Sequence, residues 1–169
     1  MAPVFTPSYC AVCGGRLEPA RSGLRGMRWR CSVCGMPVYE DPKLAVGAVV
    51  WLDGGVVLLR RAQHDEAHGR WILPGGHVNR GEVLTKAMIS EVAEETGLEV
   101  RPQGLVGVYS YEGYPWVLVV YEAMAVGGRL NPGQEALELR IFEPHAIPWD
   151  ELGYRSTAEA LGDALRRRK

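Results

Sequence analysis

Residues 76–98, GHVNRGEVLTKAMISEVAEETGL, contain four glutamates, and three of them crowd the end of a predicted helix. At about 3.6 residues per turn, Glu91, Glu94 and Glu95 share one face of that helix, so that their carboxylates repel one another. The helix dipole adds to the repulsion, because negative charge is unfavourable in the C-terminal half of a helix. Such a cluster is either a solvated acidic face or the binding site of a divalent cation.

The apolar positions of the same helix predict how it packs. One stripe of side chains at helical spacing is expected to face the core. Gly97 is expected to end the helix, because glycine readily adopts the left-handed conformation that is common there. The predicted stripe consists of Thr85, Met88, Ile89, Val92 and Thr96.

A glycine pair just before the helix supports the cation hypothesis. Mg²⁺ and Mn²⁺ prefer carboxylate and carbonyl oxygens, and Mg²⁺ often connects one or two carboxylates to the phosphates of a substrate. In Pro74-Gly75-Gly76 the small residues let the backbone approach a ligand closely and present a carbonyl oxygen. Carboxylates, a metal ion and a glycine-rich loop together indicate phosphoryl chemistry.

The spacing of these residues resembles the Nudix box, G-x5-E-x7-R-E-U-x-E-E-x-G-U, in which U is a large aliphatic residue. Gly76 and Glu82 occupy the first two fixed positions, and SEVAEETGL, residues 90–98, follows at the required distance. Every fixed position matches except the arginine, which is Ser90 here. The segment GRWILPGGHV, residues 69–78, which leads into the box, is also similar to the sequence that usually precedes the box in this family.

The resemblance implies an α/β (α+β) fold, the Nudix α/β/α sandwich around a mixed sheet. It implies a pyrophosphohydrolase that uses Mg²⁺ or Mn²⁺ to cleave a nucleoside diphosphate linked to another moiety. The three helix glutamates would bind the metal beside the backbone of Gly75 and Gly76, and a metal-activated water would attack one phosphorus in line. The family varies in its general base. The candidates here are Glu91 on the helix and Glu135 or Glu138 in a later loop.

Ser90 departs from the family pattern and leaves two interpretations open. In the family, the arginine at this position pairs with box carboxylates and holds them in place, which serine cannot do. We hypothesise that Lys86, one turn from both Ser90 and Glu82, pairs with Glu82 and partly replaces the missing charge. The alternative is a weakly active domain or a nucleotide-binding regulator.

The rest of residues 43–169 has the pattern of one packed domain. Gly54 and Gly55 are expected to form a hairpin turn, and residues 62–70 a polar loop. A C-terminal amphipathic helix is expected over residues 156–169, with Ser156 or Thr157 as its cap. The predicted strands are residues 44–52, 56–61, 98–113, 115–126 and 137–144.

The first 42 residues form a separate module, too small to fold on a hydrophobic core alone. Two C-x-x-C pairs lie in it with 17 residues between them, and a glycine follows each pair. This spacing resembles a zinc ribbon, in which four thiolates hold a structural Zn²⁺ and leave no open position for catalysis. We therefore expect a zinc ribbon over residues 1–42 and a Nudix domain over residues 43–169. The zinc ligands would be Cys10, Cys13, Cys31 and Cys34.

A zinc ribbon followed by a Nudix domain is similar to a group of short Nudix proteins that includes plant chloroplast FAD and ADP-ribose pyrophosphatases. It is more distantly similar to NADH pyrophosphatases, whose motif after the box, S-Q-P-W-P-F-P-x-S, is missing from this sequence. The resemblance implies a substrate of the FAD, ADP-ribose or NADH type. The candidates for contacts with its base or phosphates are Arg60, Arg61, Arg70, Tyr111, Tyr114 and Trp116.

The composition argues against several other classes of protein. A formal net charge of −1 does not favour nucleic acid, and the arginine excess in the first 40 residues is modest. No apolar run approaches the roughly 20 residues of a membrane span, and the first residues lack the pattern of a signal peptide. We expect a cytoplasmic enzyme without nucleic-acid or membrane partners, and a homodimer by family habit.

Overall fold

The computed structural model describes residues 7–20, 27–39 and 41–168, with residues 27 and 28 described by their backbone alone. The chain divides into two compact units, Met1–Pro42 and Lys43–Lys169. Residues 1–6, 21–26 and 40 of the predicted zinc ribbon lie outside the described residues.

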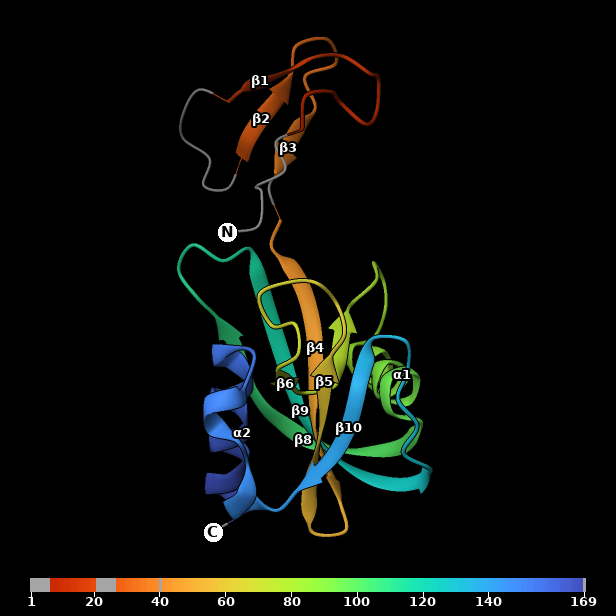
Figure 1. Cartoon of the computed structure of the whole chain (residues 1–169). Coiled ribbons are helices and arrows are strands. Elements are labelled where there is room, and N and C mark those ends of the chain that lie inside the picture. Colours follow the sequence, from red (N-terminus) through yellow and green to blue (C-terminus); the bar gives the residue numbers. More distant parts are fainter. Residues whose placement is uncertain (1–6, 21–26, 40, 169) are drawn as a thin grey trace. The chain divides into compact units, whose positions relative to one another are not determined.

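The first unit contains three short strands, β1 (Leu17–Pro19), β2 (Met27–Cys31) and β3 (Pro37–Tyr39). They form an antiparallel sheet in the order β1-β2-β3 (Figure 1). Its buried cluster consists of Cys10, Leu17 and Cys31, against which Trp29 and Val38 pack. An apolar cluster of this size does not stabilise a fold by itself. This agrees with the expectation that the first unit needs a structural metal ion.

The second unit is built around a mixed sheet. Its strands are β4 (Lys43–Leu52), β5 (Gly55–Arg61), β6 (Trp71–Ile72), β7 (Gly75–His77), β8 (Leu98–Ser110), β9 (Trp116–Gly128) and β10 (Ala136–Phe142). The main order is β10-β5-β4-β9-β8, with β6 paired to β5 and β7 paired to β4 (Figure 1). β4 and β9 run parallel, and the other named pairs are antiparallel.

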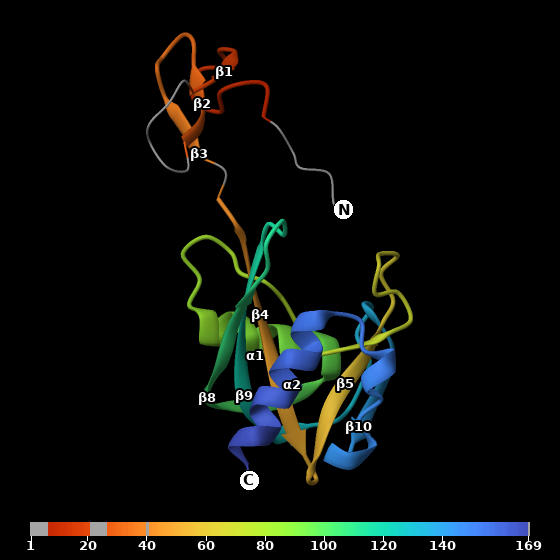
Figure 2. The same cartoon turned by 90° about the vertical axis from the view of Figure 1, so that its left-hand side faces the viewer.

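Two helices, α1 (Leu84–Thr96) and α2 (Arg155–Arg167), cover opposite faces of this sheet, as Figure 2 shows. Successive side chains of β4 alternate between the two cores: Val49 packs in the core under α2, and Val50 in the core under α1. This arrangement is an α/β/α sandwich, so the predicted fold class is confirmed. No helix of the described residues is long and apolar enough to cross a membrane. Two 3-10 helices, η1 (Pro144–Ala146) and η2 (Trp149–Glu151), precede α2.

The turn between β4 and β5 lies one residue earlier than predicted. Asp53 and Gly54 are its central residues, with φ of 50° and 83°, and Leu52 pairs with Gly55 across it. Positive φ at both positions matches the twist of the two strands, which is why Asp-Gly is favoured in such turns. Gly55 belongs to β5, where a Cβ would lie 2.5 Å from Ile141 Cγ2.

Two helix predictions were also wrong. The N-cap residue of α2 is Tyr154, without a side-chain cap, so neither Ser156 nor Thr157 caps the helix, and Thr157 is buried in the core instead. In α1, Ile89 is 36% exposed, whereas Glu95 is buried. Burial of a glutamate in place of an isoleucine cannot follow from hydrophobicity, so a specific contact must hold Glu95 there.

Candidate active site

The glutamate helix packs against the glycine pair that precedes it. β7 is held in the sheet by β4, and residues 78–83 lead from β7 into α1. At the other end of α1, Gly97 is the C-cap with φ of 72°, as predicted. The strand and the helix thereby bring the backbone of Gly75 and Gly76 against the glutamate face.

Glu95 is the most deeply buried of the three helix glutamates, with 5% of its surface exposed. The backbone N–H of Gly75 donates a hydrogen bond to its Oε2 at 2.7 Å. Burial raises the pKa of Glu95 to about 8, the Gly75 hydrogen bond opposes the shift, and the charges of Glu91 and Glu135 add to it. A buried carboxylate among other carboxylates is costly unless a cation neutralises it, so this environment fits a metal ligand.

The carboxylate of Glu91 lies directly against Gly76. A Cβ built on Gly76 would be 2.4 Å from Oε2 of Glu91, far inside van der Waals contact. Glycine is therefore required for this approach. Burial raises the pKa of Glu91, and neighbouring carboxylates add to the shift. These neighbours are Glu94, which is exposed, Glu135 and Glu82.

Glu135 reaches the same cluster from a distant part of the chain. The connection between β9 and β10 runs beside the end of α1 (Figure 1), where the N–H of Gly133 donates to the carbonyl of Glu95 at 3.1 Å. Glu135 follows two residues later, and its charge acts on both Glu91 and Glu95. Of the two late candidates for the general base, Glu135 is therefore the one beside the box.

Glu138 and two of the candidate substrate arginines have other partners. Glu138 forms ion pairs with Arg60, at 3.8 Å, and with Arg140. Arg60 also donates to the carbonyl of Gly69 at 2.7 Å. Arg70 donates to the carbonyls of residues 150 and 152 at 3.4 Å. The contact of Arg60 with Gly69 holds the loop of residues 62–70, and the contacts of Arg70 join this loop to the segment before α2.

Arg61 is the arginine whose charge acts on the carboxylate cluster. Its side chain is 15% exposed, and it opposes the upward pKa shift of Glu95. It donates to Gln63 Oε1 at 2.5 Å, and Gln63 Nε2 donates in turn to Glu135 Oε2. Nothing in the sequence pattern marks Gln63, because its partner lies 72 positions away.

Of the aromatic residues predicted to contact substrate, Trp116 has a ring contact with a residue of the box. Its ring centroid is 4.7 Å from that of His77, the residue after Gly76. The Nζ of Lys43 lies 5.0 Å from the centroid of the same ring. The parallel register of β4 and β9, which pairs Lys43 with Trp116, makes this cluster, and a sequence pattern does not reveal it.

The other two aromatic candidates are placed differently. The hydroxyl of Tyr111 donates to Glu159 Oε2 of α2 at 2.8 Å, and the Arg155 guanidinium lies 4.6 Å from its ring centroid. Tyr111 is therefore engaged with α2, on the face of the sheet opposite α1. Tyr114 is 60% exposed, in the turn between β8 and β9.

The ion pair hypothesised between Lys86 and Glu82 does not form. Glu82 Oε2 accepts hydrogen bonds from the backbone and the side chain of Asn79, at 2.9 and 3.2 Å. Across the described ranges, no ion pair involves Lys86. Ser90 is exposed. The carboxylate of Glu82 thus fastens the entrance of α1 and leaves Lys86 in solvent.

The four cysteine sulfurs of the first unit form a compact cluster. All four Sγ atoms lie within 4.8 Å of one another, and two of the distances are 3.5 and 3.8 Å. Sulfurs around a tetrahedral Zn²⁺ are about 3.8 Å apart, because each Zn–S bond is about 2.3 Å. The glycines that follow the two pairs, Gly14 and Gly35, have positive φ of 72° and 71°. Backbone N–H groups, chiefly that of Cys34, lower the pKa of Cys31 to about 6, which favours its thiolate, whereas the neighbouring thiols and burial raise the pKa of Cys34.

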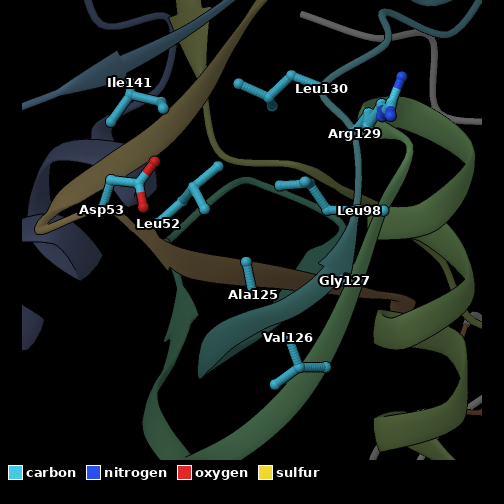
Figure 3. A pocket seen from close by; sticks show the side chains of 10 residues that line it. Leu52, Asp53, Leu98, Ala125, Val126, Gly127, Arg129, Leu130 and Ile141 are labelled. Atoms are coloured by element: carbon cyan, nitrogen blue, oxygen red, sulfur yellow. The ribbon is translucent and has the colours of Figure 1, made fainter.

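Figure 3 shows a surface hollow of about 410 Å³. It is bounded by the β4–β5 turn and by the segment that leaves β9. Apolar side chains such as Leu52, Leu98 and Ile141 line much of it, and Asp53 and Arg129 stand at its sides. None of the predicted site residues is among its lining residues, so the hollow is not the candidate active site.

Comparison with known proteins agrees with this geometry. The family model described as NUDIX domain matches residues 41–161. Over 116 residues the chain is 32% identical to an ADP-ribose pyrophosphatase from Methanocaldococcus jannaschii. This alignment covers 66% of this chain and 68% of that protein. Over 136 residues it is 38% identical to the 8-oxo-dGDP phosphatase NUDT18 of Homo sapiens, covering 80% of this chain. The matched part is 39% of that relative, so the chain spans about two fifths of its length.

A solved structure matches the chain over most of its length. The crystal structure of a NUDIX hydrolase from Nitrosomonas europaea superposes with a TM-score of 0.86 at 28% identity. The match covers 96% of this chain and 92% of the other. With the family match over residues 41–161, these findings show that the chain belongs to the Nudix family and is a pyrophosphohydrolase.

Proposed function

We propose that this Nudix hydrolase cleaves the diphosphate of a nucleoside diphosphate linked to another moiety, with Mg²⁺ or Mn²⁺ as its cofactor. The observation that carries the proposal is the convergence of Glu91 and Glu95 on the backbone of Gly75 and Gly76. A hard divalent cation prefers such oxygen donors and relieves the crowding that raises both carboxylate pKa values.

The three helix glutamates would have different roles, because they differ in exposure. Buried Glu95 and half-buried Glu91 would hold the cation, and exposed Glu94 would face the substrate side. A cation bound there neutralises diphosphate charge and lowers the pKa of an attacking water. Glu91 and Glu135 are the candidates for the general base, because both lie at the cluster.

ADP-ribose is the first substrate to test, because the chain is similar to an ADP-ribose pyrophosphatase over two thirds of its length. Trp116 offers a partly buried aromatic face near the box, and Lys43 and His77 stand beside it. Such a cluster suits a nucleobase or a phosphate group. FAD and NADH belong to the same chemical class, and 8-oxo-dGDP is a smaller alternative named for another relative.

We infer that the first unit holds one structural Zn²⁺, as in the short zinc-ribbon Nudix group that the sequence resembles. The sulfur cluster and the two positive-φ glycines support this inference. Four thiolates would complete the coordination of Zn²⁺, so a catalytic role does not follow. A cytoplasmic homodimer without nucleic-acid partners remains the expectation from sequence.

A hydrolysis screen with Mg²⁺ or Mn²⁺ tests the proposed function. The panel is ADP-ribose, FAD, NADH, CoA, diadenosine polyphosphates, 8-oxo-dGDP and nucleoside triphosphates. Glu94→Gln should abolish turnover, and Glu99→Gln, at an exposed glutamate of β8, is the matched control. Cleavage of a dinucleotide-type substrate that only Glu94→Gln loses supports the proposal. Tight nucleotide binding without turnover favours the regulator that Ser90 allows.

A further inference from the structure

Glu135 belongs to a connecting segment, so its carboxylate needs contacts that fix it beside the box. The residue is exposed and immediately precedes β10. Its main chain is held by the residue that follows β5, because the Ala62 N–H donates to the Glu135 carbonyl at 2.9 Å. A side chain that serves a reacting centre must also be held, since a displacement of about 1 Å costs about 100-fold in rate.

Gln63 supplies the contact to the side chain. Its Nε2 donates to Glu135 Oε2, while its Oε1 accepts from the Arg61 guanidinium at 2.5 Å. The amide can do both at once because it carries a donor and an acceptor on opposite sides. As a neutral group, Gln63 orients the carboxylate without cancelling its charge. The charge of Glu135 acts on both Glu91 and Glu95.

Arg61 is a rigid anchor for this connection. Its Nε donates to Asp65 Oδ2 at 2.7 Å, and the same oxygen accepts from the Tyr154 hydroxyl at 3.2 Å. The other oxygen of Asp65 accepts from the N–H of Ala67 at 3.0 Å. Ala67 is fully buried, so the loop of residues 62–70 is pinned to the core. The hydrogen bonds thus run from a fixed loop through Gln63 to Glu135.

We propose that Gln63, held by Arg61, is a positioning residue that fixes Glu135 beside the box glutamates. The inference rests on the proposed function, because Glu135 acts there only if the box glutamates bind a divalent cation. Arg61, which comes from β5 and not from α1, also adds a positive charge that opposes the upward pKa shift of Glu95.

Gln63→Leu tests the inference, because it removes both hydrogen bonds and keeps a side chain of similar size. Gln103→Leu is the matched control, since Gln103 is exposed and, among the residues that the structure describes, its side chain makes only a 3.5 Å hydrogen bond to the carbonyl of Arg101. With ADP-ribose and Mn²⁺, the kcat of Gln63→Leu should fall about 10- to 100-fold, the usual cost of losing the partner of a metal-site carboxylate. KM and melting temperature should match those of the control.

A double-mutant cycle tests whether Gln63 acts through Glu135. We expect Gln63→Leu to add no further loss of kcat to that of Glu135→Gln, because both changes remove the same positioned carboxylate. If the two losses multiply, or if Gln63→Leu behaves like Gln103→Leu, the inference is overturned.

Mn²⁺ binding, followed by electron paramagnetic resonance of the free ion, separates this inference from the proposed function. If the wild type turns over none of the substrates, the proposed function fails and the Mn²⁺ titration alone decides. Weaker Mn²⁺ binding by Gln63→Leu than by Gln103→Leu then supports the positioning role. Equal binding by the two variants overturns it.

Discussion

Gly76→Ala perturbs the contact on which the proposed site depends. The added Cβ would lie 2.4 Å from Glu91 Oε2, and ordinary contacts begin at 3.4 Å, so the carboxylate must move by about 1 Å. A displacement of that size in a catalytic group costs about 100-fold in rate. Because the obstacle is the end of a flexible side chain, the fold itself should accommodate the new methyl group.

The assay is steady-state hydrolysis of ADP-ribose with Mg²⁺, combined with thermal unfolding. We expect the kcat of Gly76→Ala to fall about 100-fold while its melting temperature stays close to that of wild type. Gly104→Ala is the control, because nothing lies within 4 Å of its added Cβ. Gly75→Ala provides the contrast: its Cβ would lie 2.2 Å from the carbonyl oxygen of Val46, so that variant should lose stability. A folded Gly76→Ala enzyme with wild-type kcat would refute the reasoning.

Three further outcomes are expected. Without divalent cations, the raised pKa of Glu95, about 8 against an ordinary 4.5, means that its ionisation destabilises the fold. The unfolding free energy of wild type relative to Glu95→Gln should therefore fall between pH 4.5 and 8, by up to about 5 kcal/mol, and a pH-independent difference would contradict this. Cys34→Ser should lower the zinc content measured by elemental analysis from about one ion per chain to near zero, because it removes a ligand. Trp116→Ala should raise the KM for ADP-ribose more than Tyr111→Phe does, since the Tyr111 hydroxyl already binds Glu159. If Tyr111→Phe raised KM more, the adenine of the substrate would not bind at Trp116.

The sequence was informative wherever a feature depends on neighbours within one element. Helical spacing predicted that Glu91, Glu94 and Glu95 share a face, and the left-handed preference of glycine predicted the helix end at Gly97. The same reasoning failed for Ile89. The stripe in the structure is rotated toward Glu95, because the N–H of Gly75, 20 positions earlier, pulls this carboxylate into the interior.

Contacts between distant strands decide the features that the sequence left open. It offered Glu135 and Glu138 as equivalent late glutamates, yet they differ because β10 pairs with β5 through a bulge between Ala136 and Glu138. The bulge sets Glu138 opposite Arg60, where the two form an ion pair. Glu135 stays outside the strand, within reach of Gln63. A bulge adds one unpaired residue to a strand and interrupts the alternation of inward and outward side chains. The bulge therefore cannot be predicted from the pattern of residues 131–142.

The difference between features set within one element and features set by distant strands also applies to the missing box arginine. Spacing within α1 places the proposed metal ligands, whereas the positive charge that acts on Glu95 comes from Arg61 at the end of β5. A charge supplied from a strand does not depend on the residue at position 90, so Ser90 by itself does not identify an inactive domain. What decides is whether Gln63 holds the Glu135 carboxylate in place, and the double-mutant cycle of Gln63→Leu and Glu135→Gln measures this directly.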